Sequence, residues 1–399
     1  MRIAATDFLV QRLKIGVLRI YDYCLVMKTI SLFSGAGGLD IGARMAGAEI
    51  VCSVDTDLDS LKTLKLNEIS NPSTLINEDI SNLTGEDILR QCGHSKNEIE
   101  FLIGGPPCQS FSKNNYWTKS GKESLRRKKR MKKTAENTGR EFIGDITLPK
   151  AKKRLDVHED KRTSLVMEYA RLIDEISPRG FLFENVQSIT HPKNKKYLYE
   201  FINYTERCGY RVKELRLSSE LFGVAQKRKR VFVIGHKQKA LGEPEITHSD
   251  DNSVFLKPLI TSKMAIHKYR FKKYFEEGEI IEGRWSEYIP DIPPGMNYKA
   301  LTSWAGYENP IFEAETKFWN FLLKLHPDKP SWTIASNPGP WVGPFHWNNR
   351  RLRTVEMAAL QSFPDDYKFY GSRRSRIRQI GNAVPPLMAK AVMEILVKS

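Results

Sequence analysis

Strands and helices alternate along most of the first 235 residues, and a glycine-rich turn joins the first strand to the first helix. The segment TISLF is short, apolar and partly β-branched, and residues 39–46 after it place apolar side chains at helical spacing. FSGAGG, which lies between them, breaks the strand. Strands that alternate with helices form a parallel sheet covered by helices. The alternation therefore predicts an α/β fold with a doubly wound, mostly parallel sheet, whose functional groups lie at the C-terminal ends of the strands.

The alternation of strands and helices ends after the predicted strand RVFVIG. The strands predicted after TISLF are EIVCSV, TLINEDI, EIEFLI, FLFENV, VKELRL and RVFVIG, with helices over 58–67, 164–176 and 197–208. From 236 to about 345 the chain is irregular and rich in Pro, Trp and Tyr, which indicates a second, smaller domain. A helix is expected over 351–362, and GNAVPPLMAKAVMEILV predicts a turn followed by an apolar helix. The predicted organisation is an N-terminal extension (1–26), a catalytic and cofactor-binding domain (27–235), the smaller domain (236–345) and a C-terminal segment that returns to the catalytic domain (346–399).

Charge favours a polyanionic partner. The chain has 399 residues with 63 Lys and Arg against 47 Asp and Glu, a formal charge of +16. Such a balance is typical of nucleic-acid binding, although a merely basic surface is the alternative. Nine of the residues 119–133 are Lys or Arg, within a basic insertion over about 113–159. This insertion either contacts phosphates or has no role.

Composition also excludes several protein classes. Hydrophobic residues make up 40% of the chain, enough for a real core, and no run of about 18 apolar residues predicts a membrane span. The first 26 residues lack the long apolar region and cleavage site of a secretory signal. The five cysteines are too scattered for a disulfide framework and lack zinc-ligand spacing, so no metal is expected. We therefore expect a cytoplasmic protein without a membrane partner.

Three features along the first strands predict a nucleoside cofactor. Glycines in FSGAGG permit positive φ and close approach of a ligand to the backbone, but their spacing is not GxGxxG, which disfavours a nicotinamide dehydrogenase. Asp55 ends the next strand some 20 residues on, where a ribose hydroxyl pair would be held. Asp79 ends the third strand and could accept a hydrogen bond from an adenine amine. Each acid alone could equally be a turn residue at a strand end.

GGPPCQSFS is the most informative stretch. Two glycines and two prolines make a rigid turn directly after an apolar strand, so Cys108 lies at the sheet edge beside the predicted cofactor. A lone cysteine is most often a small buried hydrophobe, which suits Cys24, Cys52 and Cys208. Pro-Pro-Cys-Gln in a polar turn is a poor core sequence. Cys108 is therefore a candidate nucleophile, which needs positive surroundings or a base to form its thiolate.

Six segments, taken in order, resemble the motifs of the DNA (cytosine-5-)-methyltransferases. They are FSGAGGLDIG, GGPPCQSFS, FENV, QKRKRVFVIG, LQSFPDDY and QIGNAVPP, and they run from about Met27 to the C-terminus. Their sizes and spacing are similar to those of bacterial restriction–modification enzymes. The resemblance implies a Rossmann-like methyltransferase fold, S-adenosylmethionine as cofactor, a cytosine in double-stranded DNA as substrate, and a target-recognition domain at 236–345. It also implies a monomer that is linked to a restriction endonuclease by function rather than by contact.

The resemblance assigns catalytic roles at matching positions. It implies that Cys108 adds to C6 of cytosine and that Glu184 acts on N3 as an acid, for which burial would have to raise its pKa. A strand-end ion pair is the alternative for Glu184. It further implies that Arg230 reaches the cytosine O2 and that Arg228 supports the site, the alternative being a basic strand edge. Strand alternation places Gln226, Arg228 and Arg230 on one side. The catalytic set is completed by two sequence neighbours of these residues, Gln109 and Asn185. Asn185 is expected to orient the turn.

The cofactor and substrate residues follow from the same resemblance. The family usually has a larger apolar residue where Thr56 stands, and a proline where Ala225 stands. The GNAVPP turn would close the pocket, and it can also be a helix start with Pro385 and Pro386 in its first turn. The implied cofactor residues are Phe33, Ser34, Gly35, Gly37, Gly38, Leu39, Asp55, Thr56, Asp79, Ile80, Gly105, Pro106, Asn382 and Val384. The implied substrate residues are Ser112, Gln226, Thr333 and Ile334.

Two other functions stay open on sequence grounds. A tRNA cytosine-5 methyltransferase would carry the same motifs, although the long variable region and the basic insertion favour DNA. A nucleic-acid-binding module that has lost catalysis is the second alternative, and the intact Cys108, Glu184 and Arg230 argue against it. Because a base inside a duplex is out of reach, a methyltransferase acting on DNA must rotate its target out of the helix.

Overall fold

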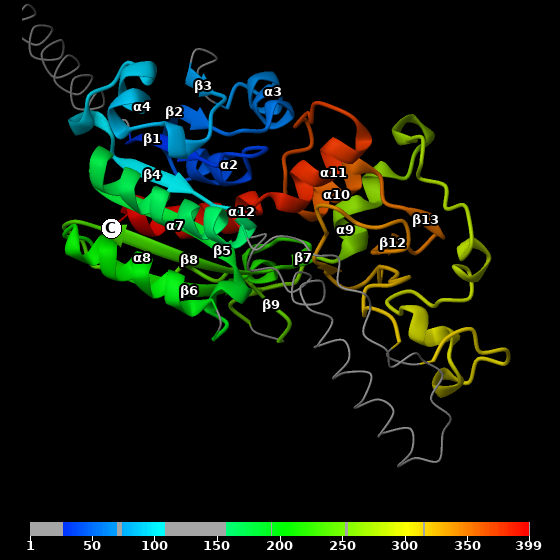
Figure 1. The fold of residues 1–399 in the computed structure, drawn as a ribbon. Helices are drawn as coiled ribbons and strands as arrows, with labels where there is room; N and C mark the ends of the chain where they lie inside the picture. Colours follow the sequence, from blue (N-terminus) through cyan, green and yellow to red (C-terminus); the bar gives the residue numbers. More distant parts are fainter. Residues whose placement is uncertain are drawn as a thin grey trace, which may run out of the picture.

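The fold is known from a computed structural model, which describes residues 27–69, 74–107, 157–192, 194–251, 254–313 and 316–398. The predicted N-terminal extension and most of the basic insertion lie outside these residues. The catalytic domain is built on a seven-stranded sheet with the order β3-β2-β1-β4-β5-β8-β6 (Figure 1). Its strands are β1 (Met27–Leu32), β2 (Ala48–Val54), β3 (Leu75–Ile76), β4 (Phe101–Gly104), β5 (Gly180–Val186), β6 (Arg211–Ser218) and β8 (Lys229–His236).

All pairings from β3 to β5 are parallel, as the alternation of strands and helices predicted. Strand β8 alone is reversed, and it pairs antiparallel with β5 on one side and with β6 on the other. Only about ten residues join β6 to β8, too few for a crossover helix, so the chain turns back beside the strand it has just made. The predicted doubly wound, mostly parallel sheet is confirmed.

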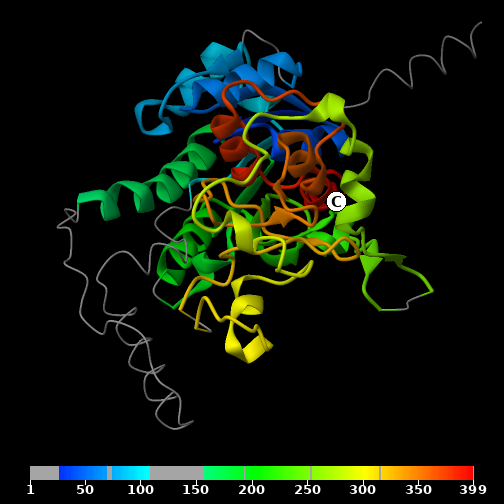
Figure 2. The same cartoon turned by 90° about the vertical axis from the view of Figure 1, so that its right-hand side faces the viewer.

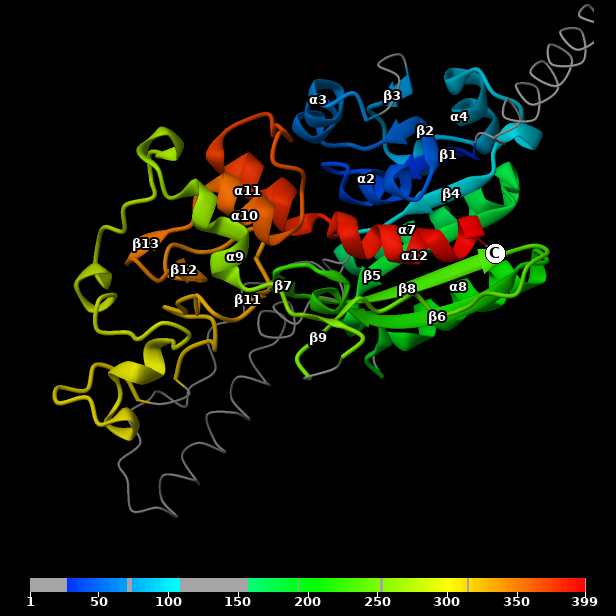
Figure 3. The same ribbon diagram turned by 180° about the vertical axis from the view of Figure 1, so that it is seen from behind.

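Helices cover both faces of the sheet. On one face, α4 (Gly85–Cys92), α7 (Val157–Ile176) and α8 (Lys195–Arg207) share a core with the sheet (Figure 1). On the other face, α2 (Gly38–Met45) packs against α12 (Pro386–Lys398), the last helix (Figure 3). An added Cβ on Gly42 would lie 2.4 Å from Ala389 Cβ, so these two helices touch at their backbones. The expected return of the C-terminal segment to the catalytic domain is thereby made by α12.

A stretch of 26 residues, Arg373–Lys398, reaches the length and mean hydropathy of a membrane span. It consists of α11 (Arg373–Asn382) and α12, and 67% of its most apolar part is buried inside the protein. Packing of α12 against α2 and the sheet accounts for the apolar side chains. The stretch is a core element of this fold.

The smaller domain has little regular structure, as its sequence predicted. Figure 2 views it end-on, with short elements joined by long loops. Its core gathers around Ile292, Tyr298 and Leu322. The predicted boundary at 345 and 346 falls inside β12. The short elements are β9 (His248–Ser249), β10 (Lys257–Pro258), α9 (Ser262–Ile266), β11 (Ser331–Trp332), β12 (Phe345–His346) and β13 (Arg350–Arg351).

Helices α10 (Thr354–Leu360) and α11 lie between the two domains (Figure 1). They share a core with α9 of the smaller domain and with α2 and α3 (Leu58–Leu66) of the catalytic domain. An ion pair reinforces this junction, because Arg353 Nε donates to Glu279 Oε2 at 2.5 Å and both side chains are buried. The predicted turn at GNAVPP is placed differently: Gly381 and Asn382 are the last residues of α11, and only Ala383–Pro385 separate it from α12.

Candidate active site

The C-terminal ends of β1, β2, β4 and β5 meet at one edge of the sheet, where most of the predicted site residues lie. Cys108, Gln109 and Ser112 lie outside the described residues, whereas Gly105–Pro107, directly before Cys108, are described. An added Cβ on Gly105 would lie 2.9 Å from Glu184 Oε2. The turn that leads to Cys108 therefore passes directly against the carboxylate of Glu184, and a larger residue at Gly105 would require that carboxylate to move.

Glu184 and Arg230 form the central ion pair of this edge. Arg230 Nε donates to Glu184 Oε1 at 2.7 Å, and each side chain is only 11% exposed. The two residues are diagonal neighbours on one face of the β5–β8 ladder, since Glu184 pairs with Phe232, two residues from Arg230. Burial raises the pKa of Glu184, and the nearby cations Arg230 and Arg228 oppose that rise. The strand-end ion pair that was the alternative for Glu184 is therefore present, and a buried carboxyl with a raised pKa can also hold a proton and donate it, so the acid role stays a prediction.

Asn185 connects the same strand end to the turn before Cys108. Its side-chain amide donates to Pro106 O at 3.2 Å, and its Oδ1 accepts from the N–H of Val186 at 2.9 Å. Both ends of the amide are thus used to hold backbone, which is consistent with the predicted orienting role.

Arg228 joins three segments that are distant in sequence. Its Nη2 donates to Gly381 O at 2.7 Å and its Nη1 to Ile334 O at 3.4 Å, while its backbone N–H donates to Ser219 Oγ at 3.0 Å. The residue is fully buried, as is Gln226, whose Oε1 accepts from the N–H of Ile334 at 3.1 Å. The predicted alternation is confirmed, because Lys227 and Lys229 on the other side are exposed.

The predicted target-recognition signature lies directly beside these arginines. Strand β11 pairs in parallel with β7 (Gln226–Lys227), so Trp332 lies opposite Lys227. The hydroxyl of Thr333 donates to Lys227 O at 2.8 Å. Thr333 is exposed and Ile334 is buried, so of the two only Thr333 presents its side chain to solvent.

The glycines of the first turn have two different functions. Gly35 has φ +52°, and the nearest atom to an added Cβ is Phe33 O at 3.9 Å, so space is open above it. At Gly38, by contrast, an added Cβ would lie 2.2 Å from Val384 O, and at Gly37 it would lie 2.6 Å from Leu64 Cδ2. We predicted that all of these glycines admit a ligand. At Gly37 and Gly38 the space on the Cβ side is filled by the protein's own chain, and the contact of their backbone with the cofactor stays a prediction.

The strand ends around this turn supply polar groups and backbone strain. Asp55 Oδ2 accepts from the N–H of Gly35 at 2.8 Å and its Oδ1 from Asp57 N–H at 2.8 Å. Burial raises the pKa of Asp55, although these N–H donors lower it. Phe33 has φ +53°, a conformation that bulky side chains rarely adopt and that is concentrated at functional sites.

The remaining predicted cofactor residues lie around the same edge. Asp79 Oδ1 accepts from the N–H of Ser81 at 3.0 Å and so caps the short helix that begins at Ile80, the turn-residue role left open for it. Ser34 Oγ donates to Ser31 O at 3.0 Å. Leu39, Ile80 and Val384 are buried, Thr56 and Asn382 are exposed, and Pro106 is buried. Val384 therefore contributes its backbone carbonyl to this turn, while its side chain belongs to the core.

Two residues near the turn were not predicted. Tyr367, in the LQSFPDDY motif, donates its hydroxyl to Ala36 O at 2.7 Å and so holds the glycine turn from the C-terminal segment. Asp40 is fully buried and accepts from Ser31 Oγ at 2.5 Å and Ser53 Oγ at 3.3 Å. Burial raises the pKa of Asp40 to about 7. Its one sequence signal was a charge on the inward face of an otherwise apolar helix.

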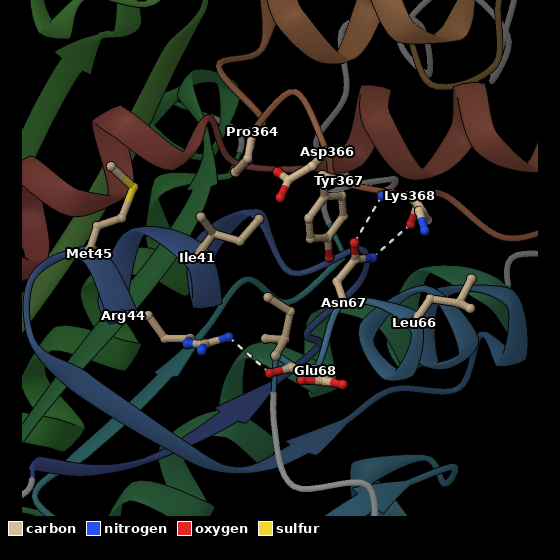
Figure 4. A pocket seen from close by; sticks show the side chains of 11 residues that line it. Ile41, Arg44, Met45, Leu66, Asn67, Glu68, Pro364, Asp366, Tyr367 and Lys368 are labelled. Carbon is tan, nitrogen blue, oxygen red and sulfur yellow. Dashed lines mark hydrogen bonds between the residues drawn. The ribbon is translucent and has the colours of Figure 1, made fainter.

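A groove of about 650 Å³ lies on the outer side of α2 and α3, where residues 364–368 cross them (Figure 4). Its polar groups already hold backbone: Arg44 Nη1 donates to Glu68 O at 3.0 Å, and Asn67 exchanges hydrogen bonds with the backbone of Lys368. Tyr367, one of the residues that line this groove, also holds the glycine turn through its hydrogen bond to Ala36 O. Within the described ranges, no group of three or more His, Cys, Asp and Glu is placed to hold a metal ion.

Comparison with known proteins identifies the family. The sequence matches the C-5 cytosine-specific DNA methylases over residues 27–129 and 151–398. The chain belongs to the C-5 cytosine-specific DNA methylase family. This DNA (cytosine-5-)-methyltransferase is 32% identical over 400 residues to the type II methyltransferase M.SacI of Streptomyces achromogenes, covering 93% of each chain. It is 30% identical to the type II methyltransferase M1.HphI of Haemophilus parahaemolyticus, covering 94% of this chain and 88% of that protein.

The fold is also found in a solved structure, that of a prophage-encoded protein from E. coli described as a DNA modification methyltransferase. The two superpose with a TM-score of 0.63 at 22% identity, over 93% of this methylase and 99% of the other chain. Both the resemblance expected from the motifs and the Rossmann-like methyltransferase fold are thereby confirmed. The family match is to DNA methylases, which favours DNA over the tRNA alternative.

Proposed function

We propose that this methylase transfers a methyl group from S-adenosylmethionine to C5 of a cytosine rotated out of duplex DNA, as the modification enzyme of a type II restriction–modification system. The observation that carries the proposal is the buried Glu184–Arg230 pair, which contacts the turn leading directly to Cys108. The type II assignment is supported by the names of the relatives, which this chain covers over nearly their full length.

The described residues at the edge of β1 and β2 fit a nucleoside-linked methyl donor. A carboxylate has about four lone-pair sites, and Asp55 receives backbone N–H groups of Gly35, Asp57 and Thr56, which leaves room to accept a ribose hydroxyl. The open space above Gly35 lies close to that carboxylate, because the Gly35 N–H donates to Asp55 Oδ2, and the strained Phe33 stands two residues before Gly35. Asp79 and Ile80 would border the adenine. When bound, S-adenosylmethionine supplies an electrophilic methyl group on a sulfonium.

Cytosine C5 is a poor nucleophile until the ring is activated, and this chain's residues would activate it. In our proposal the Cys108 thiolate forms a bond to C6, and Glu184 donates a proton to N3 as negative charge develops on the ring. Arg230 donates to O2. Activated in this way, C5 would take the methyl group of the bound donor, whose sulfur would keep the electron pair of the broken S–CH3 bond. Loss of the C5 proton to a base would then break the sulfur–C6 bond, return the N3 proton to Glu184 and release Cys108 as thiolate. The raised pKa of Glu184 supports its role as proton donor.

The remaining parts of the proposal concern partners. The protein would act as a monomer on double-stranded DNA in the cytoplasm, and a restriction endonuclease would be linked to it only because both recognise the same sequence. Gln226, Thr333 and Ile334 would hold the recognition domain against the extruded base, with Thr333 in contact with it.

The decisive experiment compares two cysteine variants in a tritium-transfer assay. Cys108→Ala is expected to abolish methyl transfer while donor binding is kept, because only the nucleophile is lost. Cys208→Ala, at the end of α8 on the far face of the sheet, is the matched control and is expected to keep activity. Retained turnover by Cys108→Ala would refute the nucleophile.

Two further measurements complete the test. A duplex with 5-fluorocytosine at the target is expected to form a covalent adduct with the wild type, since fluorine at C5 blocks the final elimination. Bisulfite sequencing of DNA from a host that expresses the protein would return the recognition sequence and the modified cytosine. If DNA from a host that expresses active enzyme carried no 5-methylcytosine, the result would contradict the proposed substrate.

A further inference from the structure

Two tryptophans of the smaller domain are exposed and contact each other. Trp319 is 53% and Trp332 45% exposed, and their ring centroids lie 5.2 Å apart at 67°. The backbone of Trp319 is fixed, because Asn297 Nδ2 donates to its carbonyl at 2.5 Å. Trp332 is fixed by its place in β11. A held pair of large aromatic rings that faces solvent is unusual, because most Trp residues bury the greater part of their surface.

The pair lies at the margin of the proposed active site. Trp332 lies opposite Lys227 in the β7–β11 ladder, which is visible where the two strands adjoin in Figure 3. Lys227 precedes Arg230 by three residues, which spans about 10 Å of extended chain. Trp332 also immediately precedes Thr333, whose hydroxyl contacts Lys227 O. The aromatic pair therefore adjoins the strand end that carries Arg230, on the side of the strand to which Lys227 points.

The charges around the pair favour a nucleic acid over an apolar protein surface. The two lysines of the facing strand, Lys227 and Lys229, are exposed on its outer side. Their side chains would be desolvated without compensation under an apolar partner, whereas phosphates would pair with them. Aromatic rings beside cations are typical of proteins that hold unstacked bases.

We propose that Trp332, supported by Trp319, stacks on a base next to the position that the extruded cytosine vacates. The inference rests on the proposed function, because it requires a base to leave the duplex. Rotating a base out removes stacking from its neighbours, and an aromatic ring inserted beside them replaces part of that contact. Loss of one base–aromatic stack lowers affinity by about 5- to 100-fold.

The test uses the full-length protein and a duplex that contains the sequence it methylates, with 2-aminopurine at the target position. Emission of 2-aminopurine rises when the base leaves the stack. We expect Trp332→Ala to weaken DNA binding by about 5- to 100-fold and to lower the emission. Donor affinity and the unfolding midpoint are expected to stay at wild-type values, because the ring is exposed. Trp332→Phe, which keeps an aromatic face, is expected to restore most of both signals.

Tyr199→Ala is the matched control. Tyr199 is similarly exposed, at 48%, and lies on α8, on the outer face of the catalytic domain, so its loss should change none of these values. Wild-type DNA affinity and emission in Trp332→Ala would overturn the proposal. A self-association of the wild type that Trp332→Ala abolishes, with DNA binding unchanged, would also overturn it and assign the pair to a second copy of the chain.

The outcomes separate this inference from the proposed function. If the wild type methylates DNA and Trp332→Ala behaves like it, the stacking inference fails and the methyl-transfer proposal stands. If the wild type transfers no methyl group to DNA, the proposed function fails by its own assay. If the wild type methylates DNA and Trp332→Ala binds DNA weakly, the result supports both the stacking inference and the methyl-transfer proposal.

Discussion

Gly38→Ala tests whether the glycine turn is shaped by the C-terminal chain. The added Cβ would lie 2.2 Å from Val384 O and 3.2 Å from Ala383 Cβ. An ordinary contact needs about 1 Å more, and the nearer neighbour is backbone, which cannot rotate away. Overpacking of this kind costs about 1–3 kcal/mol. The cost should lie near the upper end of that range, at about 2–3 kcal/mol, because the Cβ meets backbone at 2.2 Å. The gain from replacing Gly by Ala at a helical position is at most about 1 kcal/mol, so a net loss of about 1–2 kcal/mol is expected.

The assay is urea unfolding of the full-length protein, read as the free energy of unfolding. Gly242→Ala is the control, since no atom lies within 4 Å of its added Cβ, and its effect should stay within about 0.5 kcal/mol. Gly35→Ala tests whether the turn also admits the methyl donor. Its Cβ has room but its φ of +52° costs about 1–2 kcal/mol, and it is expected to weaken donor binding more than Gly38→Ala does. Wild-type stability of Gly38→Ala would refute the contact with the C-terminal turn.

Three more predictions follow from the site. Glu184→Gln is expected to lower kcat by about 10²- to 10⁴-fold in the tritium assay, because the amide cannot give a proton to N3. Wild-type kcat should fall as pH rises through the raised pKa of Glu184, and this fall should be absent from the variant. A loss of kcat below tenfold would contradict the acid role. Asp40→Asn is expected to flatten the dependence of the free energy of unfolding on pH. The pKa of Asp40 is raised from 3.8 to about 7, so the stabilisation it gives is full below pH 4, and about 4 kcal/mol of it is lost as pH rises through 7. An equal change in the free energy of unfolding between pH 5 and pH 8 in variant and wild type, measured with urea, would exclude this. Deletion of Lys119–Lys133 is expected to reduce the slope of log affinity for DNA against log salt, and an unchanged slope would mean that the basic insertion contacts no phosphate.

The sheet and most of its helices could be predicted, because apolar periodicity determines them. Helix α11 was missed for a physical reason: its sequence, RRSRIRQIGN, buries polar side chains as well as isoleucines. Gln379 Oε1 accepts from Thr63 Oγ1 at 2.6 Å, and Ser375 Oγ donates to Asp59 at 2.5 Å. A helix face held by hydrogen bonds leaves no hydrophobic pattern in the sequence.

The site was predicted at the level of residue types and strand ends. Alternation correctly put Gln226, Arg228 and Arg230 on one side, and the buried state of Glu184 agrees with the acid that the motif implied. The glycine pattern showed where a Cβ is not tolerated, but not which atoms fill the space, because at Gly38 and Gly42 those atoms come from residues more than 300 positions away. For the same reason Tyr367 could not be assigned to the glycine turn from the sequence.

The contact between α2 and α12 affects how the protein is made. About 340 residues separate the two helices, and ribosomes add about 5–20 residues per second, so α2 waits some 20–70 s for its partner to be synthesised. Throughout that time the nascent chain exposes the apolar side of α2 and leaves the turn at Gly38 without the carbonyl that closes it. Translation thus delivers the smaller domain before the turn at Gly38 is closed, and a chain released early would lack that closure.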